Sequence, residues 1–181
     1  MASKRTARST GLPAGQPTGR GTALTGWRLW RVAPDGTLRS LWRGGHQPWT
    51  AAPQRATCPP GSRRSFTLTA PGSHRVPGVD CDCGYHVLLD PRQLDRLRVQ
   101  PVVVAGTARV WGAVVPHAQG YRAEWCQVTA LLDGPVPGST HEHWASPAQV
   151  WAAAARHHLP VLPADLVHEG RWQHEQGSTR T

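Results

Sequence analysis

Residues 102–132 read VVVAGTARVWGAVVPHAQGYRAEWCQVTALL, and this stretch decides the fold. Two long runs rich in Val, Ala and Trp flank a short polar loop, and such runs have the composition and alternation of β-strands. Gly120 stands in the loop, where a residue that accepts a positive φ would allow a tight connection. The stretch therefore predicts one long antiparallel β-hairpin.

A second hairpin is predicted nearer the N-terminus, over residues 26–42. GWRLWRV begins it, Pro34-Asp35-Gly36 has the composition of a turn, and TLRSLW resumes the strand pattern. Residues 43–65, rich in Gly, Pro, Arg and Thr, predict a long irregular connection. YHVLL at residues 85–89 predicts a further short strand, and LPVLP at residues 159–163 a short edge strand.

Two short helices complete the prediction. Asp90-Pro91 supplies an N-cap and a first-turn proline for a helix that carries Leu94 and Leu97 on one face. Ser146-Pro147-Ala148-Gln149 is a capping box that opens a helix through about His157. The residues expected to pack this helix are Val150, Trp151, Ala154 and Ala155. The predicted class is α+β: two antiparallel β-hairpins, two short helices and a metal-braced loop.

The composition predicts a single metal-braced domain over residues 24–165. Residues 1–23 are rich in Gly, Pro, Ser and Thr and predict a disordered basic arm, and residues 166–181 predict a flexible tail. No apolar run approaches ~20 residues, which predicts that no segment spans a membrane. The basic N-terminal segment has no apolar stretch after it, which predicts a cytoplasmic protein without a secretory signal.

The chain is strongly basic, with a formal net charge of +9. Residues 1–22 carry four of the cations and no acid: Lys4, Arg5, Arg8 and Arg20. Such an arm favours a nucleic-acid partner, since its cations would contact phosphates. The chain also has no Ile and no Asn, and a single Lys, which indicates a GC-rich bacterial genome that inflates the arginine count.

Four thiol and imidazole side chains lie within a short segment: Cys58, His74, Cys81 and Cys83. Cysteines in a cytosolic protein favour metal binding or reactive thiols over disulfides. Three sulfurs and one imidazole suit tetrahedral zinc, and a closed set of four protein ligands is typical of a structural site. Cys81 and Cys83 need a turn to bind one ion together, and Asp82 and Gly84 supply residues that bend readily.

Other assignments of these groups stay open at this point. The thiols could be free or redox-active, and Cys126 or His86 could substitute for a ligand. The simpler interpretation of Cys126 is a small buried core residue.

The segment 111–125 concentrates polar chemistry around one hairpin end. His117 with Glu124 could do acid–base work. The simpler interpretation pairs Arg122 with Glu124 on the surface.

The nine tryptophans follow no internal repeat and are more typical of core residues than of a binding platform. Six lie in predicted elements and are expected in the core: Trp27, Trp30, Trp42, Trp111, Trp125 and Trp151. Three lie in loops or tails, too few to form a surface on which bases stack: Trp49, Trp144 and Trp172.

GWRLWRV, Cys58, the segment from His74 to CDCG, and WGAVVPHAQGYRAEW together resemble an uncharacterised family of small actinobacterial proteins. That family combines a Trp-rich first strand, a C-x-C-G motif and a W-G-x-V-V-x-H-x-x-G-Y-R-A-E segment, and the resemblance spans roughly residues 26–132. It implies a shared pattern and no activity. Tyr85-His86 and Pro116 depart from the residues usual in the family at these positions.

The favoured function is that of a non-enzymatic cytosolic zinc-binding protein, a binding or regulatory module with nucleic acid as partner through the N-terminal arm. The first alternative is a thiol-redox or zinc-dependent enzyme that uses Cys81 and Cys83 with His117 and Glu124. The second is a protein–protein adaptor, in which Arg and Trp form the interface.

Overall fold

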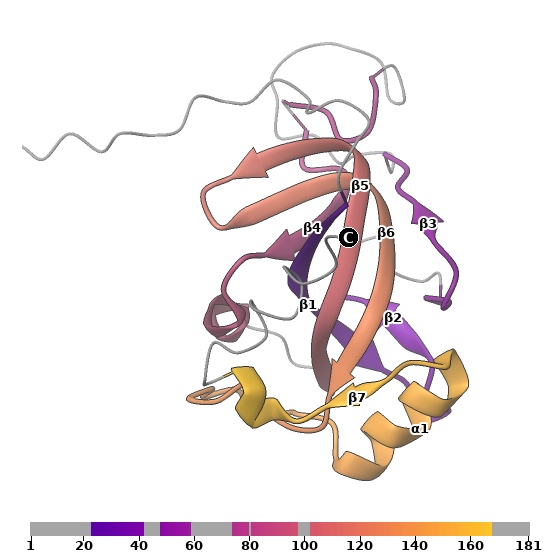
Figure 1. Cartoon of the computed structure of the whole chain (residues 1–181), viewed down its shortest axis with the longest axis vertical. Coiled ribbons are helices and arrows are strands. Elements are labelled where there is room, and N and C mark those ends of the chain that lie inside the picture. Colours follow the sequence, from indigo (N-terminus) through magenta and orange to yellow (C-terminus); the bar gives the residue numbers. More distant parts are fainter. Residues whose placement is uncertain (1–22, 42–47, 59–73, 80, 98–101, 168–181) are drawn as a thin grey trace, which may run out of the picture.

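The long hairpin predicted from the sequence is confirmed. The computed structural model describes residues 23–41, 48–58, 74–79, 81–97 and 102–167. Strand β5 (Val103–His117) and strand β6 (Gly120–Leu132) pair antiparallel along nearly their whole length. The two strands run through the middle of the molecule, and every other strand pairs with one of them or with β1 (Figure 1).

The first hairpin is also confirmed, as β1 (Leu24–Val32) and β2 (Leu38–Ser40). The Ala33 amide donates to the Thr37 carbonyl at 2.9 Å, and Gly36 adopts a φ of +78° in the turn. The other edge of β1 pairs with β5, from Leu24 opposite Val110 to Arg31 opposite Val103. The two predicted hairpins therefore belong to one sheet.

Strand β4 (Tyr85–Leu88) closes this sheet on itself. It pairs with the start of β6, from Tyr85 opposite Ala123 to Leu88 opposite Gly120, and meets β1 where Leu88 lies opposite Trp27. The ladders β1–β5, β5–β6, β6–β4 and β4–β1 thus form a closed circuit. Gly120 is needed here for space and not for a positive φ, since a Cβ on it would lie 1.9 Å from the Val87 carbonyl oxygen.

Two irregularities bend the long hairpin enough for this closure. The register of β5 and β6 shifts between Thr107 and Ala108 and again between Trp111 and Val114. Gly112 lies in the second shift with a φ of +83°, a conformation that a residue with a Cβ rarely adopts. Such β-bulges kink a strand and increase its twist.

Two very short strands extend the sheet on the open edge of β6. Strand β3 (Gln54–Arg55) pairs antiparallel and lies inside the segment that the sequence predicted to be irregular. Strand β7 (Val161–Leu162) confirms the predicted edge strand and pairs parallel to the end of β6. The parallel β7 makes the seven-stranded sheet mixed.

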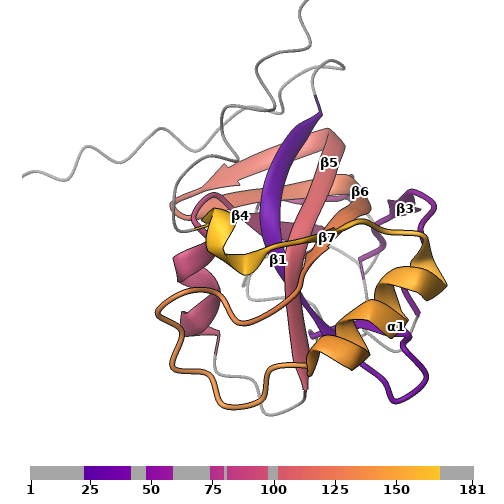
Figure 2. The same cartoon turned by 60° about the horizontal axis from the view of Figure 1, so that its bottom comes forward.

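Helix α1 (Pro147–His157) begins at the predicted capping box, with the Ser146 side chain accepting from the Gln149 amide. Its buried face consists of Val150, Ala153, Ala154 and His157, whose Nε2 accepts from the Leu38 amide at 3.3 Å. The prediction that Trp151 and Ala155 pack inward is wrong, because both are exposed. Figures 1 and 2 both place α1 beside β7.

The predicted helix after Asp90 is a six-residue 3₁₀ helix, η1 (Pro91–Arg96), and a second 3₁₀ segment, η2 (Ala164–Val167), follows β7. The Asp90 carboxylate accepts from the Arg92 amide as the predicted N-cap. A spacing of three residues, such as that of Leu94 and Leu97, places both on one side of a 3₁₀ helix as well as of an α-helix.

The predicted α+β class is therefore wrong. Seven strands form one mixed sheet, and α1 is the one α-helix of the described residues, so the fold is dominated by strands. The error arises because each hairpin was treated as a separate unit. The bulges in β5 and β6 allow those two strands to pair with β1, β3, β4 and β7 as well as with each other.

A buried arginine reinforces the junction of β1 and β4. Arg28 donates from Nη1 to the His86 carbonyl at 2.6 Å and from Nη2 to Ser40 Oγ at 3.0 Å. Its guanidinium carbon lies 5.0 Å from the ring centre of Trp49, and burial lowers the pKa of Arg28 below its ordinary value. Trp49, predicted to lie in a loop, is thus part of the core.

No helix within the described ranges is both long enough and apolar enough to cross a membrane. The predicted basic arm, apart from residue 23, and the predicted tail from residue 168 lie outside the described residues, as do Trp42 and Trp172.

Candidate metal centre

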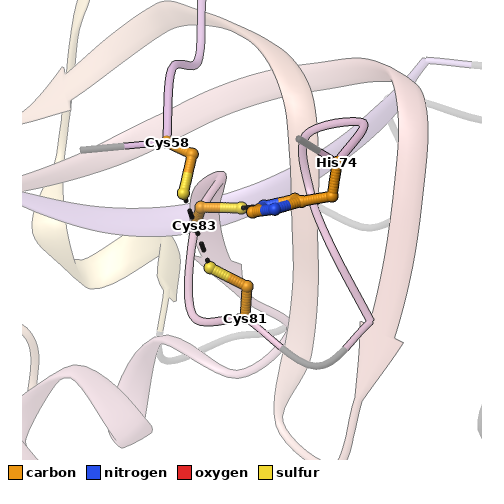
Figure 3. A group of neighbouring side chains, drawn as sticks. All are labelled: Cys58, His74, Cys81 and Cys83. Atoms are coloured by element: carbon orange, nitrogen blue, oxygen red, sulfur yellow. Dashed lines mark hydrogen bonds between the residues drawn. The ribbon is translucent and has the colours of Figure 1, made fainter. Parts of the chain in front are cut away.

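The four residues predicted as ligands converge on one point (Figure 3). Their ligand atoms all lie within 4.8 Å of one another, with Cys58 Sγ 3.7 Å from Cys81 Sγ and His74 Nε2 3.2 Å from Cys83 Sγ. Tetrahedral Zn–S bonds of ~2.3 Å place two sulfurs roughly 3.8 Å apart. The described part of the chain thus holds a Cys₃His group that could bind a metal ion.

Two strands of the sheet carry the ends of this group. Cys58 follows β3 and Cys83 precedes β4, and both strands pair with β6. Gly84, one of the two residues expected to bend the chain at the thiol pair, adopts a φ of +106° between Cys83 and β4. A Cβ on Gly84 would lie 2.9 Å from Pro77 Cβ, so the residue also allows the loop to pack closely.

A second glycine lies inside the group. The Gly78 amide donates to Cys83 Sγ at 3.3 Å, a contact of the kind that orients a thiolate ligand. A Cβ on Gly78 would lie 2.6 Å from His74 Cδ2 and 3.2 Å from Cys81 Cβ. The loop from His74 to Cys83 therefore closes tightly only with glycine at this position.

The environment of Cys83 favours the protonated thiol when no cation is bound. Burial raises the pKa of Cys83 to about 12, and the neighbouring Cys81 and Cys58 thiols add to the increase. A divalent cation reverses this preference because it binds the thiolate directly. Metal binding to this group must therefore release protons.

Arg122 fixes the loop between the ligands to strand β6. Its Nη1 donates to the Cys81 carbonyl and its Nη2 to the Val79 carbonyl at 3.4 Å. The side chain is buried, so the prediction of a surface pair with Glu124 is wrong. Arg122 acts on the polypeptide that presents Cys81, and so holds the loop in the conformation that the group requires.

Glu124 joins the two flanks of the group to the bulge in β5. Its Oε1 accepts from Arg55 Nε at 3.0 Å and Nη2 at 2.9 Å, and its Oε2 accepts from the Ala113 amide at 3.2 Å. Arg75, next to His74 in the chain, lies 3.8 Å from Oε2. The buried carboxylate is thus engaged on both oxygens, and it connects the β3 side of the group with the His74 side.

Arg122 escaped the sequence prediction as an element of the site, and Glu124 was named there only as an acid–base group of the enzymatic alternative. The available signal was their spacing, since Arg122 and Glu124 are two residues apart on a strand and share a face. Nothing in a single sequence showed that the loop from residue 74 to residue 83 lies against that face.

The remaining candidate groups lie outside the cluster. Cys126 is fully buried in the core, where burial raises its pKa to about 12, as predicted for a core residue. The His86 Nε2 lies 3.0 Å from the Asp82 carbonyl oxygen, and its ring centre is 6.0 Å from that of His117. Burial lowers the pKa of both histidines. His86 is therefore a neighbour of the thiol loop and not a member of the described group.

Arg122→Gln is expected to weaken metal binding about 10- to 100-fold, the usual cost of losing a group that orients a ligand. The shorter glutamine side chain lacks the guanidinium that donates to the carbonyls of Cys81 and Val79 together. The loop that carries Cys81 therefore loses its anchor on β6. Competition with a chromophoric chelator measures the affinity. Arg156→Gln, which removes an exposed pair with Asp35, is the control and should bind as the wild type does. Equal affinities in the two variants would contradict this role of Arg122.

Comparison of the chain with known protein families, with curated proteins and with solved structures finds no match.

Proposed function

We propose that the Cys₃His group binds one zinc ion as a structural site. The observation that carries the proposal is the convergence of three sulfurs and one imidazole within 4.8 Å. Soft thiolate ligands with one imidazole favour zinc, and four protein ligands complete its tetrahedral shell without a position for water. The ion would tie the end of β3 to the loop before β4, and so complete the junction that Arg122 and Glu124 hold from β6.

We further propose that the protein is a cytosolic, non-enzymatic binding module whose partner is nucleic acid. The net charge of +9 supports this, with four cations and no acid in residues 1–22. The catalytic alternative gains little support, because both oxygens of Glu124 are engaged by Arg55 and the Ala113 amide.

The segment that resembles the small actinobacterial proteins contains Arg122 and Glu124, and we propose that this family shares the same metal junction.

Elemental analysis of the purified protein together with thiol titration tests the metal. One zinc per chain, with three thiols that react only after a chelator is added, is the expected result. Metal-free protein with two fast-reacting thiols would instead support the redox alternative.

Binding to DNA is expected to weaken steeply as salt increases, because cations of the arm displace counterions from phosphates. Replacing Lys4, Arg5, Arg8 and Arg20 by serine should lower the slope of log affinity against log salt by up to about 3 for a single strand. Fluorescence anisotropy over a salt series measures this. Affinity that does not change with salt would contradict a phosphate-driven partner, and binding only to a protein would support the adaptor.

A further inference from the structure

Two tryptophans expected in the core lie together on the outer face of the sheet. Trp111 on β5 is directly opposite Trp125 on β6, and Arg55 on β3 is opposite Trp125 on its other side. The indole planes are 6° from parallel and their centres are 6.2 Å apart. Both side chains are only half-buried, so part of each ring faces solvent.

A cation lies over each of these rings. The Arg55 guanidinium carbon is 5.8 Å from the centre of Trp125, and that of Arg109 is 5.9 Å from the centre of Trp111. Arg109 is exposed and lies two residues before Trp111, so both side chains are on the same face of β5. The four residues form a continuous outward row across three strands, called here the tryptophan row: Arg55, Trp125, Trp111 and Arg109.

The row has a fixed geometry before any partner arrives. Glu124 accepts from Arg55 at 2.9 Å and 3.0 Å, which holds the guanidinium over Trp125 and offsets its charge. Cross-strand pairing holds the two indole planes nearly parallel, so a base that replaces the exposed Arg109 guanidinium over Trp111 would lie parallel to both rings. Arg109 is a second exposed cation, at the other end of the row.

Polar groups continue the same face beyond the row. Gln127 lies opposite Arg109 and donates from Nε2 to the Ala51 carbonyl at 2.9 Å, and the buried Thr107 pairs with Thr129 at 2.8 Å farther along the two strands. The face therefore offers aromatic surface and a cation, beside polar side chains that hydrogen-bond within the protein. It contrasts with the opposite face of β6, which carries Cys126 and Val128 into the core.

We propose that the tryptophan row binds the unpaired bases of single-stranded nucleic acid. Bases stack on aromatic side chains with little dependence on sequence, and arginine contacts the phosphates between them. A duplex keeps its bases stacked inside and offers no free face to an indole. Charge complementarity selects this partner over a neutral sugar or an apolar peptide, since Arg109 flanks the rings and the chain carries +9 overall. The inference rests on the proposed function and adds to it the surface and the strandedness of the partner.

Anisotropy titrations with a fluorescein-labelled oligothymidylate, and with a duplex of equal length, test the row. Trp111→Ala and Trp125→Ala should each weaken single-strand binding about 5- to 150-fold, which corresponds to ~1–3 kcal/mol per stacked base. Trp125→Tyr keeps an aromatic face and should retain most of the affinity. Trp151→Ala is the control, since Trp151 is 59% exposed on α1, away from the row.

Arg109→Glu gives an independent readout at an exposed position that leaves folding intact. It should weaken oligothymidylate binding at least tenfold and reduce the salt slope. Single-strand affinity that is unchanged in Arg109→Glu and in folded alanine variants would overturn the row while leaving nucleic-acid binding in place. Polyglutamate that competes equally with oligothymidylate would also overturn it, because charge alone would then suffice. If the wild-type protein binds neither the single-stranded oligothymidylate nor the duplex, the proposed nucleic-acid function itself is refuted.

Discussion

Cys83→Ala is expected to abolish zinc binding and to lower the free energy of unfolding by more than about 4 kcal/mol. Cys83 is buried at the centre of the group, beside His74 and under the Gly78 amide. With three ligands left, the loop before β4 loses its connection to the end of β3. Zinc per chain by elemental analysis and the thermal midpoint by circular dichroism measure the two effects. Adding a chelator to the wild type should reproduce both.

Cys126→Ala is the matched control for this prediction. It also removes a buried sulfur, yet Cys126 lies in the core and outside the metal group. We expect it to retain one zinc per chain and to lose about 1 kcal/mol, the scale of a small core truncation. If both variants keep the metal, or if both destabilise equally, Cys83 is not a ligand.

Gly120→Ala should also be severe, although it adds only a methyl group. The new Cβ would lie 1.9 Å from the Val87 carbonyl oxygen and 2.9 Å from Leu88 Cα, and both are backbone atoms that cannot turn aside. Strand β4 must therefore separate from β6, which opens the circuit of strands and displaces Cys83 with it. We expect a loss of more than about 4 kcal/mol, visible as a lowered thermal midpoint and as fast hydrogen exchange at the β4 amides.

Gly134→Ala is the matched control, because it makes the same glycine-to-alanine change at a position where the new Cβ clashes with nothing. A Cβ at this position would meet only Ala164 Cβ, at an ordinary distance of 3.8 Å. Stability within about 0.5 kcal/mol of the wild type is expected. A similar midpoint in the two alanine variants would mean that β4 packs less closely against β6 than the contact at Val87 requires.

Local sequence signals predicted the pieces of this fold well. The hairpins, the capping box at Ser146 and the strand at Tyr85 depend on neighbours in the chain, which a single sequence displays. The grouping of Cys58, His74, Cys81 and Cys83 was predicted for the same reason, because their chemistry and short spacing are visible without a structure. The sequences of β3 and β4 do not indicate that both strands pair with β6.

What the sequence did not predict depends on contacts between distant segments. The pairing of β4 with β6, and the role of Arg122 at the Cys81 carbonyl, join residues about forty positions apart. Trp27 and Trp30 are buried as predicted, whereas the faces of Trp111 and Trp125 were predicted wrongly, because alternation defines two faces of a strand without saying which one is covered. The buried face of β6 carries Cys126 and its neighbours, so Trp125 and the paired Trp111 lie on the opposite, partly exposed face.

The anchoring of the thiol loop on β6 has a consequence for the protein during its synthesis. All four residues of the Cys₃His group precede residue 84, whereas Arg122 and Glu124 are added to the chain about forty residues later. Domains fold as their segments emerge, at roughly 5–20 residues per second. For a few seconds the nascent chain thus presents three cysteines without the strand that secures them. We expect this interval, and not the finished protein, to be when the thiols are most exposed to oxidation or to capture of the wrong metal.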